Sequence, residues 1–394
     1  MNLRPSIANR LRLKLHSVVP DFLPRDEGET AWARLDTRRH RIGQSKRNQI
    51  GFTLVELMIG VTLGLLILAG LTEIFISNSR ARGEIEKANR QVENGRFAMQ
   101  ILSEDIRMAG FFGEFDPTVL AAPAIKPDPC MALPADLKAA LPVSVQGYDN
   151  GANWSCSISG LLSDMRTGTD ILVIRRVSTC VVGAADCDAV SAGIPYFQAA
   201  LCSNANHLGS NNTADYYGLD TTTSNLTRLK KGCATLADLR RYRTHIYFIA
   251  NNSIGSDGTP TLKRAELDAS VSGFTVVPQV EGIEDLQFEY GLDTKNPTDG
   301  TPNVFTADPD NYGTCVNGVG ANCLANWQNV VAIKVNLLAR NTDKTTGYSD
   351  DKTYSLGLKA DGTTANTFGP YHDAYKRHAF QALVRLDNPA GRKQ

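Results

Sequence analysis

The 394-residue sequence predicts an α+β protein in which one long N-terminal helix packs on a C-terminal antiparallel β-sheet body with long loops. Three observations lead to this fold class. No proline occurs between residues 52 and 116, and an apolar run is followed there by a helical stripe. The remainder consists of short segments rich in β-branched and aromatic residues, separated by polar loops.

The charge of the chain is unevenly distributed. Residues 1–51 carry eleven Lys and Arg against five Asp and Glu, whereas the rest carries thirty against thirty-six. Because phosphate binding needs a basic surface, the mildly acidic remainder argues against nucleic acid as the primary partner.

Residues 52–76 form an apolar stretch that is interrupted only by Glu56 and Glu73. About 20 apolar residues span a bilayer as a helix, so this stretch predicts one membrane pass. A basic cluster lies just upstream, at Arg38, Arg39, Arg41, Lys46 and Arg47. The positive-inside rule therefore places the N-terminus in the cytoplasm and the body on the other side of the membrane.

Three residues of this stretch have chemical consequences for the helix. Glu56 is costly in hydrocarbon unless its carboxylate has a partner, so we expect one. Gly60 and Gly64 form a G-x-x-x-G pattern that permits close helix packing in lipid. The alternative is that these glycines only loosen the helix.

Residues 77–115 are expected to form the amphipathic half of the same helix, which ends near residue 109 at Gly110 and Gly113. A stripe with alternating steps of three and four residues predicts the face that packs on the body. Its members are Ile85, Ala88, Val92, Gly95, Met99, Leu102, Ile106 and Ala109.

Residues 116–394 are expected to form the β-rich globular body. Strands are predicted at residues 171–177, 244–250, 274–280, 283–290, 330–340 and 379–386. Long polar loops are predicted at residues 203–225, 293–329 and 341–369.

All eight cysteines follow the apolar stretch, which indicates structural disulfides in an oxidising compartment. They are Cys130, Cys156, Cys180, Cys187, Cys202, Cys233, Cys315 and Cys323. No C-x-x-C pattern favours zinc or thiol redox chemistry. Eight cysteines allow about 105 pairings. The connectivity stays open, with nearest neighbours as the simplest pairing.

The sequence carries no pattern typical of an enzyme. Its six histidines show no H-E-x-x-H spacing, and neither a phosphate-binding G-x-x-x-x-G-K-[ST] loop nor a G-x-S-x-G elbow occurs. We therefore expect no catalytic residue, no metal and no cofactor. His245, in a predicted strand, is expected to be a packed or edge residue, and residues 377–378 are expected to be solvated.

The nine residues that begin at Gly51, GFTLVELMI, resemble the type III signal of type IV prepilins and pseudopilins. The resemblance implies that a prepilin peptidase removes residues 1–51 as a leader and methylates the new N-terminus, Phe52. It also implies that Glu56 meets the N-terminal amine of a neighbouring subunit. At fifty-one residues this leader is longer than usual, so either it is extended or the start is too early.

Three further segments, at residues 95–110, 280–291 and 377–388, resemble the PilW family of minor pilins, although Asp387 departs from the pattern. The resemblance implies a minor pilin with a periplasmic body that primes a type IV pilus and ends near its extracellular tip. The implied partners are other minor pilins, the major pilin and the inner-membrane assembly platform. The alternatives are a minor pseudopilin of a type II secretion system, a pilus-displayed adhesin module and a tethered enzyme.

Overall fold

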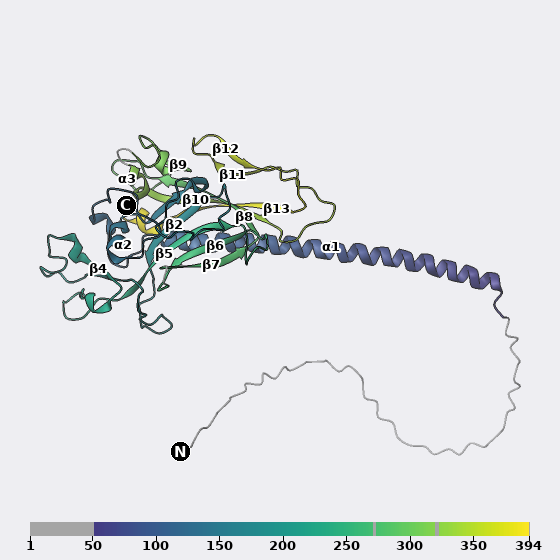
Figure 1. Ribbon diagram of the computed structural model, residues 1–394, viewed down its shortest axis with the longest axis horizontal. Helices are drawn as coiled ribbons and strands as arrows, with labels where there is room; N and C mark the ends of the chain where they lie inside the picture. Colours follow the sequence, from purple (N-terminus) through teal and green to yellow (C-terminus); the bar gives the residue numbers. More distant parts are fainter. Residues whose placement is uncertain (1–50, 271–272, 320–322, 394) are drawn as a thin grey trace, which may run out of the picture. The chain divides into compact units, whose positions relative to one another are not determined.

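The computed structural model describes residues 51–270, 273–319 and 323–393, and it confirms the predicted α+β class. Helix α1 (Leu54–Met108) precedes a body in which thirteen strands are described (Figure 1). The expected leader lies outside the described residues except for Gly51.

Helix α1 ends close to the predicted position. Gly110 follows it with a φ of 70°, a conformation that costs glycine little because it has no Cβ. The Gly110 N–H donates to the backbone oxygen of Arg175 at 2.9 Å. The residue that follows the helix is therefore hydrogen-bonded to a strand of the body.

The remaining helices are short. They are α2 (Pro134–Ala140), α3 (Cys323–Gln328) and α4 (Asp387–Gly391), with 3₁₀ turns at Pro117–Val119, Asp149–Gly151, Thr213–Tyr216, Thr223–Asn225 and Pro309–Asn311.

The described strands form two larger antiparallel sheets and a separate hairpin. They are β1 (Val145–Tyr148), β2 (Ile171–Val177), β3 (Tyr196–Ala199), β4 (Tyr217–Asp220), β5 (Arg240–Ala250), β6 (Thr261–Leu267), β7 (Phe274–Glu281), β8 (Ile283–Leu292), β9 (Val304–Thr306), β10 (Val330–Arg340), β11 (Tyr354–Leu358), β12 (Ala365–Phe368) and β13 (Arg377–Arg385). The seven-stranded sheet has the order β1-β2-β5-β3-β4, with β6 beside β5 and β7 beside β6. The four-stranded sheet has the order β13-β10-β8-β9, and β11 pairs with β12.

All six predicted strands are present, as β2, β5, β7, β8, β10 and β13. The other strands were not predicted, because most are only three to five residues long and β6 includes the charged residues Lys263, Arg264 and Glu266. The segments predicted as polar loops contain β4, β9, α3, β11 and β12. Apolar periodicity does not detect elements that are this short or this rich in charged residues.

The buried face of α1 is shorter than the predicted stripe. Gly95, Met99, Leu102 and Ile106 are buried as expected, but Ile85 is 61% exposed. Ala88 is exposed too and Val92 is half-buried. The structure instead starts the buried face at Gln91, whose side-chain amide donates to the backbone oxygens of Ala339 at 2.7 Å and Lys376 at 2.8 Å.

Both large sheets contribute to the core around α1. Leu102 and Ile106 pack in one cluster with Ile174 and Tyr247 of the seven-stranded sheet and Val335 of the four-stranded sheet. A second cluster, centred on Phe112 and Phe197, fills the other face of the seven-stranded sheet. The amphipathic half of the helix is thus a shared core element of the body.

All eight cysteines are paired, each with its nearest neighbour. The disulfides are Cys130–Cys156, Cys180–Cys187, Cys202–Cys233 and Cys315–Cys323. Their Cα–Cα distances, 5.0 to 5.7 Å, are in the ordinary range. The prediction of structural disulfides is confirmed, and the simplest of the open pairings is the one formed.

Candidate subunit-assembly site

Gly51 and Phe52 directly precede α1, and Glu56 in its first turn contacts a residue that the sequence patterns did not single out, Thr53. The Thr53 hydroxyl accepts the backbone N–H of Glu56 at 3.2 Å, and the Glu56 carboxylate accepts the backbone N–H of Thr53 at 3.2 Å. The Thr53 hydroxyl also donates to the same carboxylate at 3.2 Å. This reciprocal arrangement is a capping box, which satisfies two backbone donors at the start of a helix.

The capping box gives Glu56 a partner within its own chain. The carboxylate is held at the helix N-terminus, where the macrodipole favours a negative charge. Phe52, the residue before the cap, is 88% exposed. The signal that could have revealed Thr53 is the T-x-x-E spacing itself, which is a sequence signature of a helix start.

The apolar half of α1 has no covering within the described chain. Every residue from 51 to 82 is exposed, and the most hydrophobic 18-residue window of the helix has a mean hydropathy of 2.3 with none of it buried. A Cβ placed at Gly60 or Gly64 would meet no atom within 4 Å. The helix is long and apolar enough to cross a membrane, and the two glycines leave its surface open to a neighbour.

A buried carboxylate fixes the other half of α1 to the seven-stranded sheet. Asp105 is 5% exposed and accepts three side-chain hydrogen bonds: from Arg176 Nε at 2.6 Å, His245 Nδ1 at 2.5 Å and Tyr247 Oη at 2.8 Å. Burial alone would raise the pKa of Asp105, but His245 and Arg176 outweigh it and hold that pKa well below its usual range. His245 is packed, as predicted.

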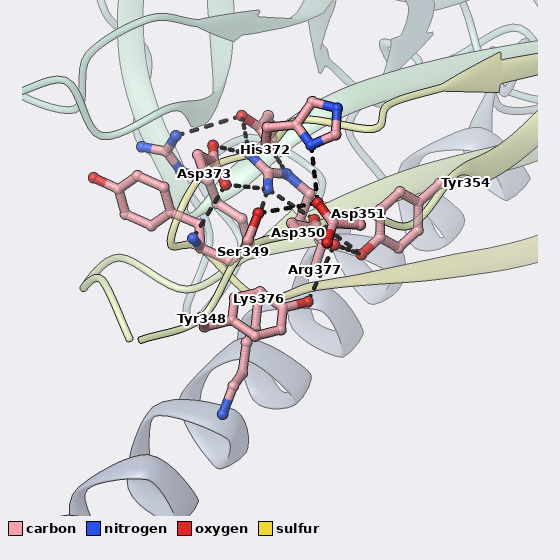
Figure 2. A network of polar contacts seen from close by, with 12 residues as sticks. Tyr348, Ser349, Asp350, Asp351, Tyr354, His372, Asp373, Lys376 and Arg377 are labelled. Carbon is pink, nitrogen blue, oxygen red and sulfur yellow. Dashed lines mark hydrogen bonds and ion pairs between the residues drawn. The ribbon is translucent and has the colours of Figure 1, made fainter. Parts of the chain in front are cut away.

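Further along the body, Arg377 lies at the centre of a buried ion network (Figure 2). Its guanidinium donates to Glu284 Oε2 at 2.5 Å, to Asp350 Oδ2 at 2.9 Å and to Asp373 Oδ2 at 2.7 Å. The prediction that residues 377–378 are solvated is wrong for Arg377, which is 7% exposed, although His378 is exposed.

This network holds the segment between β10 and β13, residues 341–376, next to α1. Glu84 of the helix accepts hydrogen bonds from Lys376 Nζ at 2.8 Å and Thr345 Oγ1 at 2.7 Å. Figure 2 shows Lys376 directed away from the network toward the helix. The bonds from Lys376, Thr345 and Lys87 lower the pKa of Glu84 to about 2. The first turns of the helix that contact the body are thus held by hydrogen bonds to residues 341–376.

Asp285, next to Glu284 on β8, has a titration that can be tested. It is 6% exposed, and burial raises its pKa from 3.8 to about 7. A folded-state pKa above the unfolded one gives stability that is present below pH 4 and lost as the pH rises through 7. We expect Asp285→Asn to remove this loss, which is worth about 2–4 kcal/mol for a shift of this size.

The measurement is the melting temperature of the purified full chain in detergent between pH 4 and pH 8. The matched control is Asp186→Asn, because Asp186 is exposed. An Asp285→Asn variant that loses as much stability as the wild type over this range would contradict the expectation.

The described residues contain one group with metal-like spacing, Asp128, Cys130 and Cys156, whose ligand atoms lie within 4.8 Å of one another. Both cysteines are joined in a disulfide. The Asp128 oxygens accept the backbone N–H groups of Cys130 at 2.8 Å and Ser157 at 3.0 Å. Every ligand atom is therefore already engaged, and the group carries no argument for a metal.

Two family models match the chain. The model described as type IV pilus-assembly protein W, PilW, matches residues 246–388, from within β5 to the start of α4. The model described as the prokaryotic N-terminal methylation motif matches residues 46–72, which include the capping box and both glycines. Over residues 246–388 the chain is similar to the PilW family. It is a type IV pilin-like minor pilin, with a methylation motif on its apolar helix and a PilW domain in its body.

No curated protein matches the sequence. Among solved structures, the type IV-like pilin TTHA1219 from Thermus thermophilus is similar, with 13% identity and a TM-score of 0.26 over 56% of this chain and 78% of that chain.

Proposed function

We propose that this PilW-family chain is a non-catalytic minor pilin. Prepilin peptidase cuts it after Gly51 and methylates Phe52. The mature chain then joins other minor pilins in a complex that primes type IV pilus assembly and stays near the pilus tip. In this proposal residues 52–76 are the membrane and filament-core segment, residues 77–115 are the helix half that packs on the body, and residues 116–394 are the periplasmic body.

The observation that carries the proposal is the uncovered apolar surface of α1. Leu54 and Phe75, near the two ends of the apolar stretch, are each 74% exposed. A contiguous apolar surface of this kind is unfavourable in water and needs lipid or other helices around it. A membrane provides this covering before assembly, and the helices of neighbouring pilins provide it in a filament.

The orientation and the site of action are inferred from chemistry. The basic residues before Gly51 favour a cytoplasmic N-terminus, and four disulfides favour an oxidising compartment for the body. A body of this size is sterically awkward along a densely packed shaft, which supports a position at the tip. The PilW match favours a pilus over a type II secretion system.

The processing step is tested by mass spectrometry of the membrane-bound chain from cells with and without prepilin peptidase. We expect the N-terminus to be methylated Phe52 when the peptidase is present and the leader to remain when it is absent. A chain that keeps its leader in wild-type cells would overturn the proposal.

The role of Glu56 is tested by its replacement with Gln and with Ala. Glutamine keeps the capping box but removes the charge that would pair with a neighbour's amine. We expect both variants to be cleaved normally and to reach sheared filaments at least about tenfold less, since an unpaired amine in hydrocarbon is strongly disfavoured.

Two controls separate charge from helix capping. Glu73→Ala removes the other acid of the apolar stretch, and Thr53→Ala removes the hydroxyl of the capping box. Both should be incorporated nearly as well as the wild type. Normal incorporation of Glu56→Gln would show that the charge has no role in assembly.

A further inference from the structure

The outer edge of β13 is an unpaired strand edge in the described part of the chain. β13 pairs with β10 along its whole length, from Arg377 opposite Arg340 to Arg385 opposite Ala332. It is the last strand of the four-stranded sheet, and no described strand pairs with its other side. A free edge presents backbone donors and acceptors to any extended chain.

The hydrogen-bond register shows which backbone N–H and C=O groups of β13 face away from β10. Leu386 donates its N–H to the backbone oxygen of Val331 at 2.9 Å, and Asn341 donates its N–H to that of Lys376 at 3.0 Å. Hydrogen-bonded pairs alternate along an antiparallel ladder, so even-numbered residues face β10. The backbone groups of Ala379, Gln381 and Leu383 therefore face outward.

This edge lacks two of the features that often protect one, a proline and a short length. The edge strand β7 contains Pro278, and the edge strand β9 has three residues. β13 has nine residues without a proline, and Leu383, two residues before its end, is 60% exposed. A long edge with an exposed apolar residue and no proline is suited to pairing with another chain.

Helix α1 runs along the same side of the body as β13 over residues 95–107. A Cβ at Gly95 would collide with the ring of Phe380, and the Asn388 side chain donates to the backbone oxygen of Arg107 at 3.5 Å. The same part of the helix lines an open depression of about 710 Å³ that includes Val92 and Arg96. The contacts of Gly95 and Asn388 therefore make α1 and β13 neighbours on this side of the body.

The charges near the edge indicate what kind of strand fits it. In the described part of the chain, Arg96, Arg107 and Arg385 form no ion pair with a carboxylate. A second copy that paired through its own β13 would bring the same arginines toward this edge, which is unfavourable for like charges. A different chain with carboxylates beside its strand would pair with them.

We propose that β13 receives an extended strand from a different pilin-type subunit, which adds to the four-stranded sheet and places acidic side chains near these arginines. This inference rests on the proposed function, because it assumes that the chain is incorporated beside other pilins. The main-chain hydrogen bonds of such a strand supply affinity, and the contact with Leu383 and the arginines supplies selectivity.

Amide hydrogen exchange tests the proposal on the full chain, first as detergent-solubilised monomer and then in sheared filaments. We expect the amides of Ala379, Gln381 and Leu383 to exchange at least tenfold more slowly in filaments. The amides of Phe380 and Ala382, which face β10, should be protected in both samples. Equal exchange of the outward amides in both samples would overturn the proposal.

Two proline variants give a matched comparison. Ala379→Pro removes an outward N–H, whereas Ala382→Pro removes one that bonds to β10. We expect Ala379→Pro to keep its melting temperature within a few degrees yet to be incorporated at least tenfold less, and Ala382→Pro to lower the melting temperature markedly. Leu383→Asp, which adds a negative charge that repels the carboxylates of the incoming strand, should behave like Ala379→Pro. Normal incorporation of both edge variants would refute the role of the edge.

A photo-crosslinking residue at position 383 identifies the occupant in assembled filaments. A crosslink to another pilin-type chain supports the proposal, and a crosslink between two copies of this chain overturns it. The inference and the proposed function fail in different ways. Absence of the wild-type chain from filaments would defeat the proposed function, whereas presence with unprotected β13 amides would defeat only the inference.

Discussion

Replacing Arg377 with methionine is expected to destabilise the body more than any other single substitution considered for this chain. The side chain is buried and pairs with three carboxylates, of which those of Glu284 and Asp350 are almost inaccessible to solvent. Methionine fills a similar volume but leaves these charges without their main partner. Breaking a buried ion network in this way costs about 3–5 kcal/mol.

The measurement is the unfolding of the purified full chain in detergent by denaturant, followed by near-ultraviolet circular dichroism. The control is Arg385→Met in the same strand, because Arg385 is exposed and should change stability by less than about 0.5 kcal/mol. An Arg377→Met variant as stable as this control would show that the network contributes little.

Arg377→Met should also weaken the contact between residues 341–376 and helix α1. Tyr348 and Tyr354 both donate to Asp350, and Lys376 adjoins Arg377 and binds Glu84. Once Asp350 loses Arg377, the segment of residues 341–376 is held by fewer bonds. We expect faster amide exchange in that segment and in the α1 turn around Glu84, before exchange increases elsewhere.

The sequence predicts those helices and strands whose apolar residues recur with a regular period over a sufficient length. The apolar run and the absence of proline set α1, and all six strands expected from apolar segments are present. The sequence does not predict how the body is divided into sheets, because the pairing partners are distant along the chain. β5, for example, pairs with β2, and although both are predicted as strands, no local signal shows that they are neighbours.

Some residues of the candidate site can likewise be recognised from the sequence, and others cannot. Gly51, Phe52 and Glu56 are recognisable because their spacing is local, and Thr53 could have been found from the T-x-x-E pattern. Asp105 could not, because it stands among exposed charged residues of the helix, and only the positions of β2 and β5 make it buried. Arg377 was expected to be solvated for the same reason: its partners come from segments 93 and 27 residues away.

Replacing Asp105 with alanine is expected to separate α1 from the seven-stranded sheet. The carboxylate is the shared acceptor for Arg176, His245 and Tyr247, and it is the only acid on the buried face of the helix among the described residues. Alanine leaves the buried His245 ring and Tyr247 hydroxyl without this acceptor and removes the carboxylate partner of the half-buried Arg176. Two buried polar groups that lose their acceptor, together with a half-buried charge that loses its partner, cost about 3–4 kcal/mol.

Glu104→Ala is the matched control, because Glu104 is the neighbouring acid on the exposed side of the same helix and bonds only to Gln100 in the described structure. Unfolding of the full chain in detergent should show a large loss for Asp105→Ala and almost none for Glu104→Ala. Equal effects would mean that Asp105 acts only through helix charge. A large loss of stability for Asp105→Ala alone would show that this carboxylate is a main link between α1 and strands β2 and β5.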